Sequence, residues 1–218
     1  MSEKKDSLKE KAYRIIKDKI IRCEYLPGDF LNEKALIEEI GASRTPIREA
    51  LNKIEQENLV RIIPKRGVVV SEITMKDISE IFQVRECVEP YAVRTTIHFL
   101  EEDMLRDFKH RFEKLDLKED YASQVKFYEL DNAFHHYIVC ASKNKYLIQT
   151  MENVYVQNQR IRLIMGKTGF NTLAIRTEHL ALIDSLLSRD EEKAVRLTLE
   201  HIETSKAIAF QTFMNFTI

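Results

Sequence analysis

Four side chains in the C-terminal two thirds of the chain have the chemistry of metal ligands. Asp131 and His135 are four residues apart, so both project from the same face of one predicted helix. His179 and His201 lie on two later predicted helices. One carboxylate and three imidazoles suit a divalent transition metal such as zinc, nickel or manganese. The spacing alone leaves a second interpretation open, because most i, i+4 pairs are contacts on a helix surface.

The elements that must bring these residues together are helices. From about residue 74 onward the apolar residues recur at helical spacing, and no strand pattern appears. The six predicted helices span residues 75–98, 101–116, 120–141, 145–166, 172–188 and 190–214. Short connections, for example at 143–144 and 166–171, favour antiparallel neighbours. The sequence therefore predicts an all-α bundle of six helices within residues 72–218.

Residues 1–71 have a different pattern. Three helical stretches come first, the second at about residues 33–40 and the third with Thr45 as its N-cap. Two β-branched runs, 60–63 and 68–70, then flank a turn that contains proline and glycine. Helix, short helix, turn, helix and hairpin is the order of a winged helix-turn-helix. The whole chain is thus expected to be mainly α, with this small domain preceding the bundle.

In a helix-turn-helix, the N-terminal residues of the second helix meet base edges, while flanking groups hold phosphates. Arg44 and Arg48 point away from the core face of that helix and suit a guanine edge or a phosphate. The neighbouring hydroxyls suit a phosphate oxygen, and the tip of the hairpin suits the minor groove. Any one of these residues, taken alone, is explained equally well as solvated surface. The ordered set predicts DNA contacts from Ser43, Arg44, Thr45, Arg48, Lys65, Arg66 and Gly67.

The residues of this domain also resemble a known family. The runs LPGDFLNE (26–33), IGASRTPIREAL (40–51) and ENLVRIIPKRGV (57–68) resemble the GntR family of bacterial transcription regulators. The resemblance implies that the positions matching Arg44, Thr45, Arg48 and Gly67 touch operator DNA. It implies the same for Lys34, where the family often has arginine; lysine keeps a phosphate contact but not a bidentate contact with a base.

The bundle carries a second resemblance. The runs ISEIFQVRECVEPYA (78–92), DNAFHHYIVCASKN (131–144), EHLALI (178–183) and EH (200–201) are similar to the FCD ligand-binding domain of the FadR subfamily, in its shorter, VanR-like form. In metal-binding members, an aspartate, a histidine four residues later and two histidines on the last two helices hold the metal. The resemblance therefore implies that Asp131, His135, His179 and His201 are the ligands.

The same resemblance implies what the protein binds besides metal. The expected effector is a small carboxylate, and Arg85 matches a position that often points into the effector cavity. The alternative for Arg85 is a surface ion pair with Glu89. A homodimer would set two winged helices against a palindromic operator, and the effector would change the affinity for DNA, most often by relieving repression.

Composition sets the class of protein. The chain has 218 residues, 44% of them hydrophobic, and a net charge of −1. The net charge hides a division, because residues 1–71 hold 15 basic and 12 acidic residues while the remainder holds 19 and 23. Three widely spaced cysteines indicate a reducing cytoplasm, and no apolar run approaches the roughly 20 residues that span a bilayer. We expect a cytoplasmic protein without a membrane partner.

Two alternatives remain open from the sequence. A metal held by four protein ligands can be purely structural, with DNA binding unchanged. A metal with open coordination positions can also activate water, as in a hydrolase. Against the second, no additional carboxylate or nucleophile has the spacing of a general base. Regulation rather than catalysis is therefore the expected role.

Overall fold

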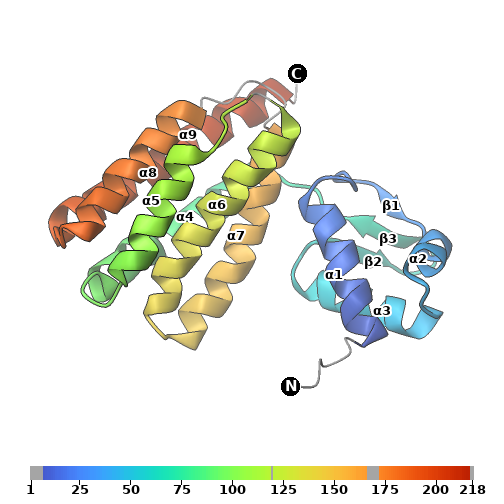
Figure 1. Ribbon diagram of the computed structural model, residues 1–218. Coiled ribbons are helices and arrows are strands. Elements are labelled where there is room, and N and C mark those ends of the chain that lie inside the picture. Colours follow the sequence, from blue (N-terminus) through green and yellow to red (C-terminus); the bar gives the residue numbers. More distant parts are fainter. Residues whose placement is uncertain (1–6, 119, 166–171, 217–218) are drawn as a thin grey trace. The chain divides into compact units, whose positions relative to one another are not determined.

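The computed structural model describes residues 7–118, 120–165 and 172–216 (Figure 1). The chain divides into two compact units, one that ends at Ile73 and one that begins at Thr74. The expected boundary lay two residues earlier in the chain. The predicted fold class, a mainly α chain with a winged helix-turn-helix before a helical bundle, is confirmed. The predicted connection at 166–171 lies outside the described residues.

The first unit combines three helices with a small sheet. Its elements are α1 (Leu8–Ile21), β1 (Phe30–Leu31), α2 (Glu33–Ile40), α3 (Arg44–Gln56), β2 (Val60–Ile63) and β3 (Gly67–Val70). Helix α1 packs on α3, and the antiparallel sheet has the strand order β1-β3-β2. The hairpin of β2 and β3 was predicted, whereas β1 was not. Two residues are too few to produce an alternating pattern in the sequence.

Local signals explain where the helices of this unit begin and end. Ser7 caps α1 by accepting a hydrogen bond from the Glu10 amide at 3.2 Å. Asn32 caps α2 in the same way, and Gly41 ends α2 in the left-handed conformation with φ of 71°. The apolar stripe of α3 is fully buried at Ile47, Ala50, Leu51 and Ile54, which fixes the outward direction of its polar residues.

The predicted start of α3 was wrong. The helix begins at Arg44 with Ser43 as its N-cap, two residues before the expected N-cap at Thr45. Pro46 is therefore the third helical residue. The first four N–H groups of a helix have no partner within that helix. The missing N–H of Pro46 therefore costs no hydrogen bond at this position either.

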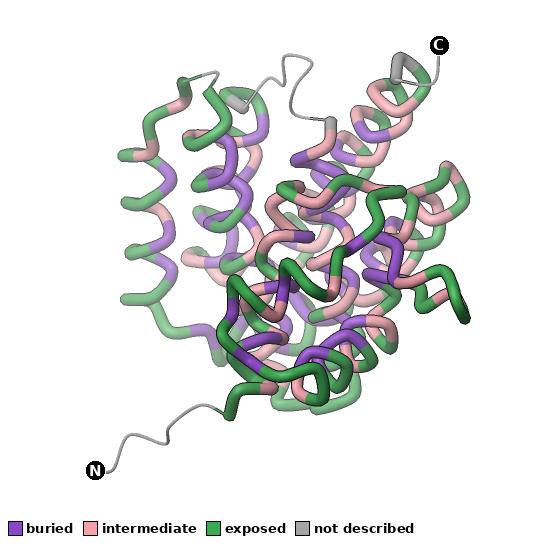
Figure 2. Tube along the Cα trace, turned by 90° about the vertical axis from the view of Figure 1, so that its right-hand side faces the viewer, coloured by how far each residue is buried: buried purple, intermediate pink, exposed green. Residues whose placement is uncertain are grey.

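The second unit is a bundle of long helices in which six helices are described. They are α4 (Met75–Thr96), α5 (Glu102–Lys114), α6 (Tyr121–Ala141), α7 (Lys145–Met165), α8 (Thr172–Leu187) and α9 (Glu191–Phe216). Helix α4 packs against α9, α6 and α7, while α5 packs against α8 (Figure 1). Buried positions recur once per turn along the helices, as the helical spacing predicted (Figure 2).

Helix α4 starts where the second unit starts. Thr74 and Asp77 form a capping box, in which each side chain accepts from the backbone N–H of the other residue. The helix continues through Pro90 to Thr96. Among the described helices of the chain, none combines the length and apolar character that a membrane crossing requires.

Candidate metal centre and DNA-binding surface

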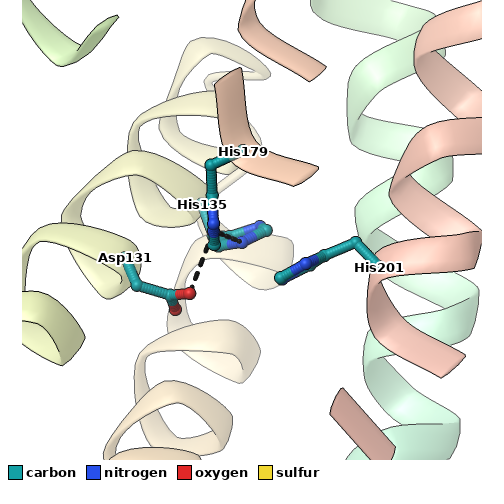
Figure 3. Close-up of side chains that lie close together, drawn as sticks. All are labelled: Asp131, His135, His179 and His201. Carbon is teal, nitrogen blue, oxygen red and sulfur yellow. Dashed lines mark hydrogen bonds and ion pairs between the residues drawn. The ribbon is translucent and has the colours of Figure 1, made fainter. Parts of the chain in front are cut away.

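The four predicted metal ligands meet in the core of the bundle. Asp131 and His135 come from α6, His179 from α8 and His201 from α9 (Figure 3). Each offers one ligand atom, and these atoms all lie within 4.8 Å of one another. The side chains are almost completely buried, with exposed fractions of 0 to 2%. Residues separated by up to 70 positions in sequence thus form one polar cluster inside an apolar core.

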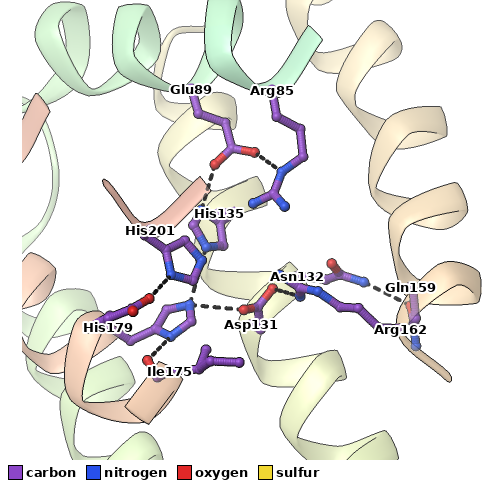
Figure 4. A network of polar contacts seen from close by, with 11 residues as sticks. Arg85, Glu89, Asp131, Asn132, His135, Gln159, Arg162, Ile175, His179 and His201 are labelled. Carbon is purple, nitrogen blue, oxygen red and sulfur yellow. Dashed lines mark hydrogen bonds and ion pairs between the residues drawn. The ribbon is translucent and has the colours of Figure 1, made fainter. Parts of the chain in front are cut away.

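A second layer of acceptors holds the three imidazole rings. Nδ1 of His135 lies 2.8 Å from Oε2 of Glu89 (Figure 4). Nδ1 of His201 lies 2.8 Å from Oε2 of Glu178. Nδ1 of His179 lies 2.8 Å from the backbone carbonyl oxygen of Ile175. A carbonyl oxygen and an ionised carboxylate only accept hydrogen bonds, so these partners assign the ring proton to Nδ1. The lone pair of each Nε2 is then left free.

These lone pairs point at one another. Nε2 of His135 and Nε2 of His179 are 3.2 Å apart, and Nε2 of His179 is 2.9 Å from Oδ1 of Asp131. With both ring protons on Nδ1, neither contact is a hydrogen bond. Within the described residues, Nε2 of His201 is buried and has no hydrogen-bond partner. Two imidazole nitrogens 3.2 Å apart can bind one divalent cation together, since Zn–N bonds are about 2.0–2.1 Å. The residues present therefore fit a bound divalent cation.

The electrostatics of the cluster keep Asp131, His179 and His201 in the form that a metal needs. Burial lowers the pKa of His179, and it holds the pKa of His201 well below its usual range, so both rings are neutral at pH 7. Burial alone would raise the pKa of Asp131, but the Arg162 guanidinium holds it well below the usual range. Asp131 is therefore an ionised carboxylate beside neutral imidazoles, as metal binding requires.

Two arginines adjoin the cluster. Arg85 Nε donates to Oε1 of Glu89 at 2.7 Å, and both side chains are buried. The alternative interpretation of Arg85, a surface ion pair with Glu89, is therefore wrong in placing the pair on the surface. The partner, Glu89, is confirmed. Arg162 donates through Nη1 to Oδ2 of Asp131. Arg160, two residues earlier, donates to Gln157 on its own helix.

Glu89 is one of the residues that sequence reasoning did not assign to the site. Its two oxygens join Arg85 to His135. The charge of Arg85 and the hydrogen bond from His135 lower the pKa of Glu89 to about 2 against the opposing effect of burial. The i, i+4 spacing of Arg85 and Glu89 was visible in the sequence. Its connection to His135 was not, because that contact joins α4 to α6.

We expect Glu89→Gln to weaken metal binding about 10- to 100-fold, the usual cost of losing an outer partner of a ligating histidine. The amide can present its NH2 group to Nδ1 and so favour the wrong tautomer of His135. Competition with a chromogenic chelator measures the change in affinity. Glu86→Gln is the matched control, since Glu86 is on the same helix and pairs with Lys206 instead. Equal metal affinity in the two variants would contradict the role of Glu89.

The predicted DNA-binding residues lie on the surface of the first unit. All of them are exposed except Gly67, which is half-buried at the start of β3. A groove of about 440 Å³ between α3 and the hairpin is lined by Arg48, Lys65 and Gly67, among others. Arg44 and Thr45 are in the first turn of α3, and Lys34 is in the first turn of α2. Within the described residues, the Ser43 hydroxyl makes no capping hydrogen bond.

One contact on this surface was not anticipated. Nε of Arg48 lies 3.3 Å from Oε2 of Glu33, a residue at the start of α2. Glu33 also lines the groove. The Arg48 side chain is nevertheless exposed and remains accessible to a ligand.

Comparison with known proteins identifies both units. The model of the FCD domain matches residues 80–204, and the model of the bacterial regulatory proteins of the gntR family matches residues 8–70. The chain therefore belongs to the GntR family of transcription regulators, with an FCD domain following its helix-turn-helix. These are families of regulators and not of enzymes, so the alternative of a hydrolase is not supported.

Individual relatives agree with this assignment. The chain is 24% identical to the transcriptional repressor RspR of Escherichia coli K12 over 89% of this chain and 85% of that protein. It is 29% identical to the gluconate operon transcriptional repressor of Bacillus subtilis 168 over 75% of this chain and 69% of that protein.

Solved structures share the fold. A GntR-type regulator from Rhodococcus sp. RHA1 superposes with a TM-score of 0.82 at 21% identity, covering 94% of this chain and 99% of that one. The structure of E. coli McbR/YncC has a TM-score of 0.76 at 22% identity, covering 95% and 99%. The zinc-bound FCD domain of TM0439 has a TM-score of 0.51 at 22% identity, covering 66% and 98%.

Proposed function

We propose that this transcription regulator is a cytoplasmic homodimeric repressor whose affinity for a palindromic operator is controlled by a small organic acid bound at a metal site. The observation that carries the proposal is the convergence of three proton-free imidazole nitrogens and one carboxylate in the core of the bundle. Repression is supported by two relatives, RspR and the gluconate operon repressor, which are transcriptional repressors. Reading a palindrome requires two copies of the helix-turn-helix.

Operator recognition is assigned to the exposed residues around the start of α3. Arg44 and Arg48 contact base edges or phosphates, and the hydroxyls of Ser43 and Thr45 donate to phosphate oxygens. Lys34 contacts a phosphate from α2. Lys65, Arg66 and Gly67 form the wing. The support for this assignment is the exposure of these side chains together with the family to which the domain belongs.

The metal is assigned to Asp131, His135, His179 and His201, and zinc, nickel and manganese all suit this ligand set. The description of a zinc-bound FCD domain for TM0439 supports the assignment. A bound divalent ion supplies a positive centre with further coordination positions for an effector carboxylate. Glu89 and Glu178 orient the rings, and Arg162 fixes the carboxylate of Asp131.

Arg85 is assigned to the effector carboxylate. Its Nε is held by Glu89, whereas its Nη1 is buried and has no hydrogen-bond partner among the described residues. A buried guanidinium N–H without a partner is costly, and an anion beside it removes that cost. The effector thereby contacts the same Arg85–Glu89–His135 chain that holds the metal site together.

We expect Arg85→Lys to lower the affinity for the effector acid roughly 10- to 100-fold, since the loss of one charge-assisted hydrogen bond costs about 1.5–3 kcal/mol. The ammonium can still pair with Glu89, so metal should be retained. An operator fragment is first selected from genomic DNA by its binding to the protein. Its release during titration with acids is then followed by fluorescence anisotropy. Arg94→Lys is the control, because Arg94 is an exposed residue of the same helix.

Two results would contradict this proposal. If the metal-loaded protein binds its operator with the same affinity in the presence of every acid, the metal has a structural role only. If Arg85→Lys responds to an acid as the unaltered protein does, the assignment of Arg85 is wrong.

A further inference from the structure

An acidic side chain lies within the DNA-binding surface of the first unit. Glu33 lines the groove between α3 and the hairpin together with Arg48, Lys65 and Gly67. A carboxylate repels the phosphates of DNA, so an acid at this position opposes the general, charge-driven part of DNA binding. The roles assigned to the surrounding cations do not explain why it is there.

Glu33 has a fixed place at the start of α2. It is the first residue of that helix, where a negative charge is stabilised by the positive end of the helix dipole. Asn32, the residue before it, caps the helix by accepting hydrogen bonds from the amides of Lys34 and Ala35. The Glu33 side chain is 27% exposed, whereas that of its partner Arg48 is 61% exposed. The carboxylate thus lies at the bottom of the contact and the arginine on its solvent side.

Arg48 differs in its pairing from the other cations of this surface. Four of them form no ion pair in the part of the chain that the structure describes, namely Lys34, Arg44, Lys65 and Arg66. Nε of Arg48, in contrast, lies 3.3 Å from Oε2 of Glu33. Neither Nη1 nor Nη2 of Arg48 has a hydrogen-bond partner among the described residues. Glu33 therefore occupies one nitrogen of the guanidinium and leaves the terminal two for a ligand.

We propose that Glu33 is a positioning residue that makes Arg48 a reader of a guanine base and not a phosphate contact. This inference rests on the proposed function, which leaves both targets open for Arg48. Guanine presents two acceptors in the major groove, O6 and N7, which one arginine can contact with two N–H groups. Because Glu33 occupies Nε, the expected contact is the end-on one through Nη1 and Nη2. Holding Nε also reduces the freedom that the long side chain loses when DNA binds.

The charge of the pair favours the same target. Arg48 and Glu33 together carry no net charge, so they attract a phosphate less than an arginine alone does. A phosphate that approaches Arg48 also approaches the carboxylate of Glu33 and is repelled by it. The edge of a guanine base carries no net charge and meets far less repulsion. The pairing is thus expected to weaken binding to DNA in general while it retains the contact with one base.

A set of operator duplexes tests the inference with the full-length protein. In each duplex one G·C pair is replaced by A·T in both half-sites of the operator that the protein selects. A scrambled duplex of the same length measures non-specific binding. We expect Arg48→Ala to remove discrimination at one G·C pair, and Glu33→Gln to reduce discrimination at that same pair about tenfold. Fluorescence anisotropy measures each affinity.

The salt dependence of binding gives a second readout. Glutamine has the shape of glutamate but no charge, so Glu33→Gln frees Arg48 to neutralise a phosphate. We therefore expect this variant to bind the scrambled duplex more tightly than the unaltered protein does. The slope of log affinity against log salt concentration should steepen by about one per chain, because each neutralised phosphate releases about one counterion.

Glu39→Gln is the matched control. Glu39 lies on the same helix as Glu33 but pairs with Lys19 of α1, so the substitution removes the same charge without affecting Arg48. We expect the ratio of operator affinity to scrambled-duplex affinity to stay unchanged in this variant and to fall about tenfold in Glu33→Gln. If Glu33 only stabilises the start of α2, the ratio will be unchanged in both variants, and the inference is overturned.

The remaining outcomes separate this inference from the proposed function. If Arg48→Ala weakens binding to every duplex by the same factor, Arg48 is a phosphate contact; the inference is then wrong, while operator recognition by this surface stands. If discrimination at a pair depends on Glu33 but not on Arg48, the carboxylate itself reads cytosine, which also overturns the inference. If the unaltered protein does not discriminate at any base pair, the proposed operator recognition fails and this inference fails with it.

Discussion

The double substitution Arg44→Ala and Arg48→Ala is expected to reduce operator affinity by a factor between about 30 and 20,000. Each arginine that contacts guanine through two hydrogen bonds contributes about 1–3 kcal/mol of discrimination. Both side chains are exposed and project from the face of α3 opposite its buried stripe, so the fold should be unaffected. Fluorescence anisotropy with the selected operator measures the loss, and circular dichroism checks the fold.

A control must separate specific contacts from the loss of two positive charges. Arg106→Ala with Arg111→Ala removes the same charge from α5, where both residues are exposed and paired within the helix. That variant should bind the operator as the unaltered protein does. An Arg44/Arg48 variant that is folded and still binds the operator normally would contradict the assignment of α3 as the reading helix.

Removal of the metal is expected to lower the stability of the bundle by about 4 kcal/mol, if the metal is present at about a thousand times its dissociation constant. For a domain of this size, such a loss lowers the melting temperature by about 8–16 °C. The physical cause is the set of lone pairs that face one another when no cation lies between them. Melting curves with and without a chelator measure the shift.

His179→Ala should abolish this response, because His179 supplies the ligand atom that contacts both Asp131 and His135. The variant is expected to melt at the same temperature with and without chelator. His136→Ala is the control: His136 is next to a ligand in sequence but is turned toward Cys140 and Glu152. A full response to chelator in His179→Ala would place the metal elsewhere.

The fold followed closely from the sequence, because helical periodicity is long and repetitive. The helices of the bundle begin and end within two residues of their predicted bounds, and α2 matches at both ends. The failures occurred where the signal is short. Thr45 and Pro46 form a plausible helix start by themselves, yet the helix begins earlier at Arg44, and the two-residue strand β1 has no pattern of its own.

The site was only partly predictable, for a different reason. The pair Asp131 and His135 is visible as spacing on one helix, while the choice of His179 and His201 among six histidines depended on the family resemblance. The residues that hold them were not foreseen, because Glu89 and Glu178 reach the rings from other helices. Such contacts depend on how helices pack, which no periodicity within one helix encodes.

Native mass spectrometry combined with elemental analysis, on protein purified without chelators, tests the central claim most directly. It reports the metal, any retained acid and the number of subunits in one experiment. We predict about one divalent metal ion per chain in a dimer, and a loss of that metal in His179→Ala but not in His136→Ala. A folded protein that binds its operator while holding clearly less than one metal per chain, even after incubation with zinc, nickel or manganese, would contradict the account.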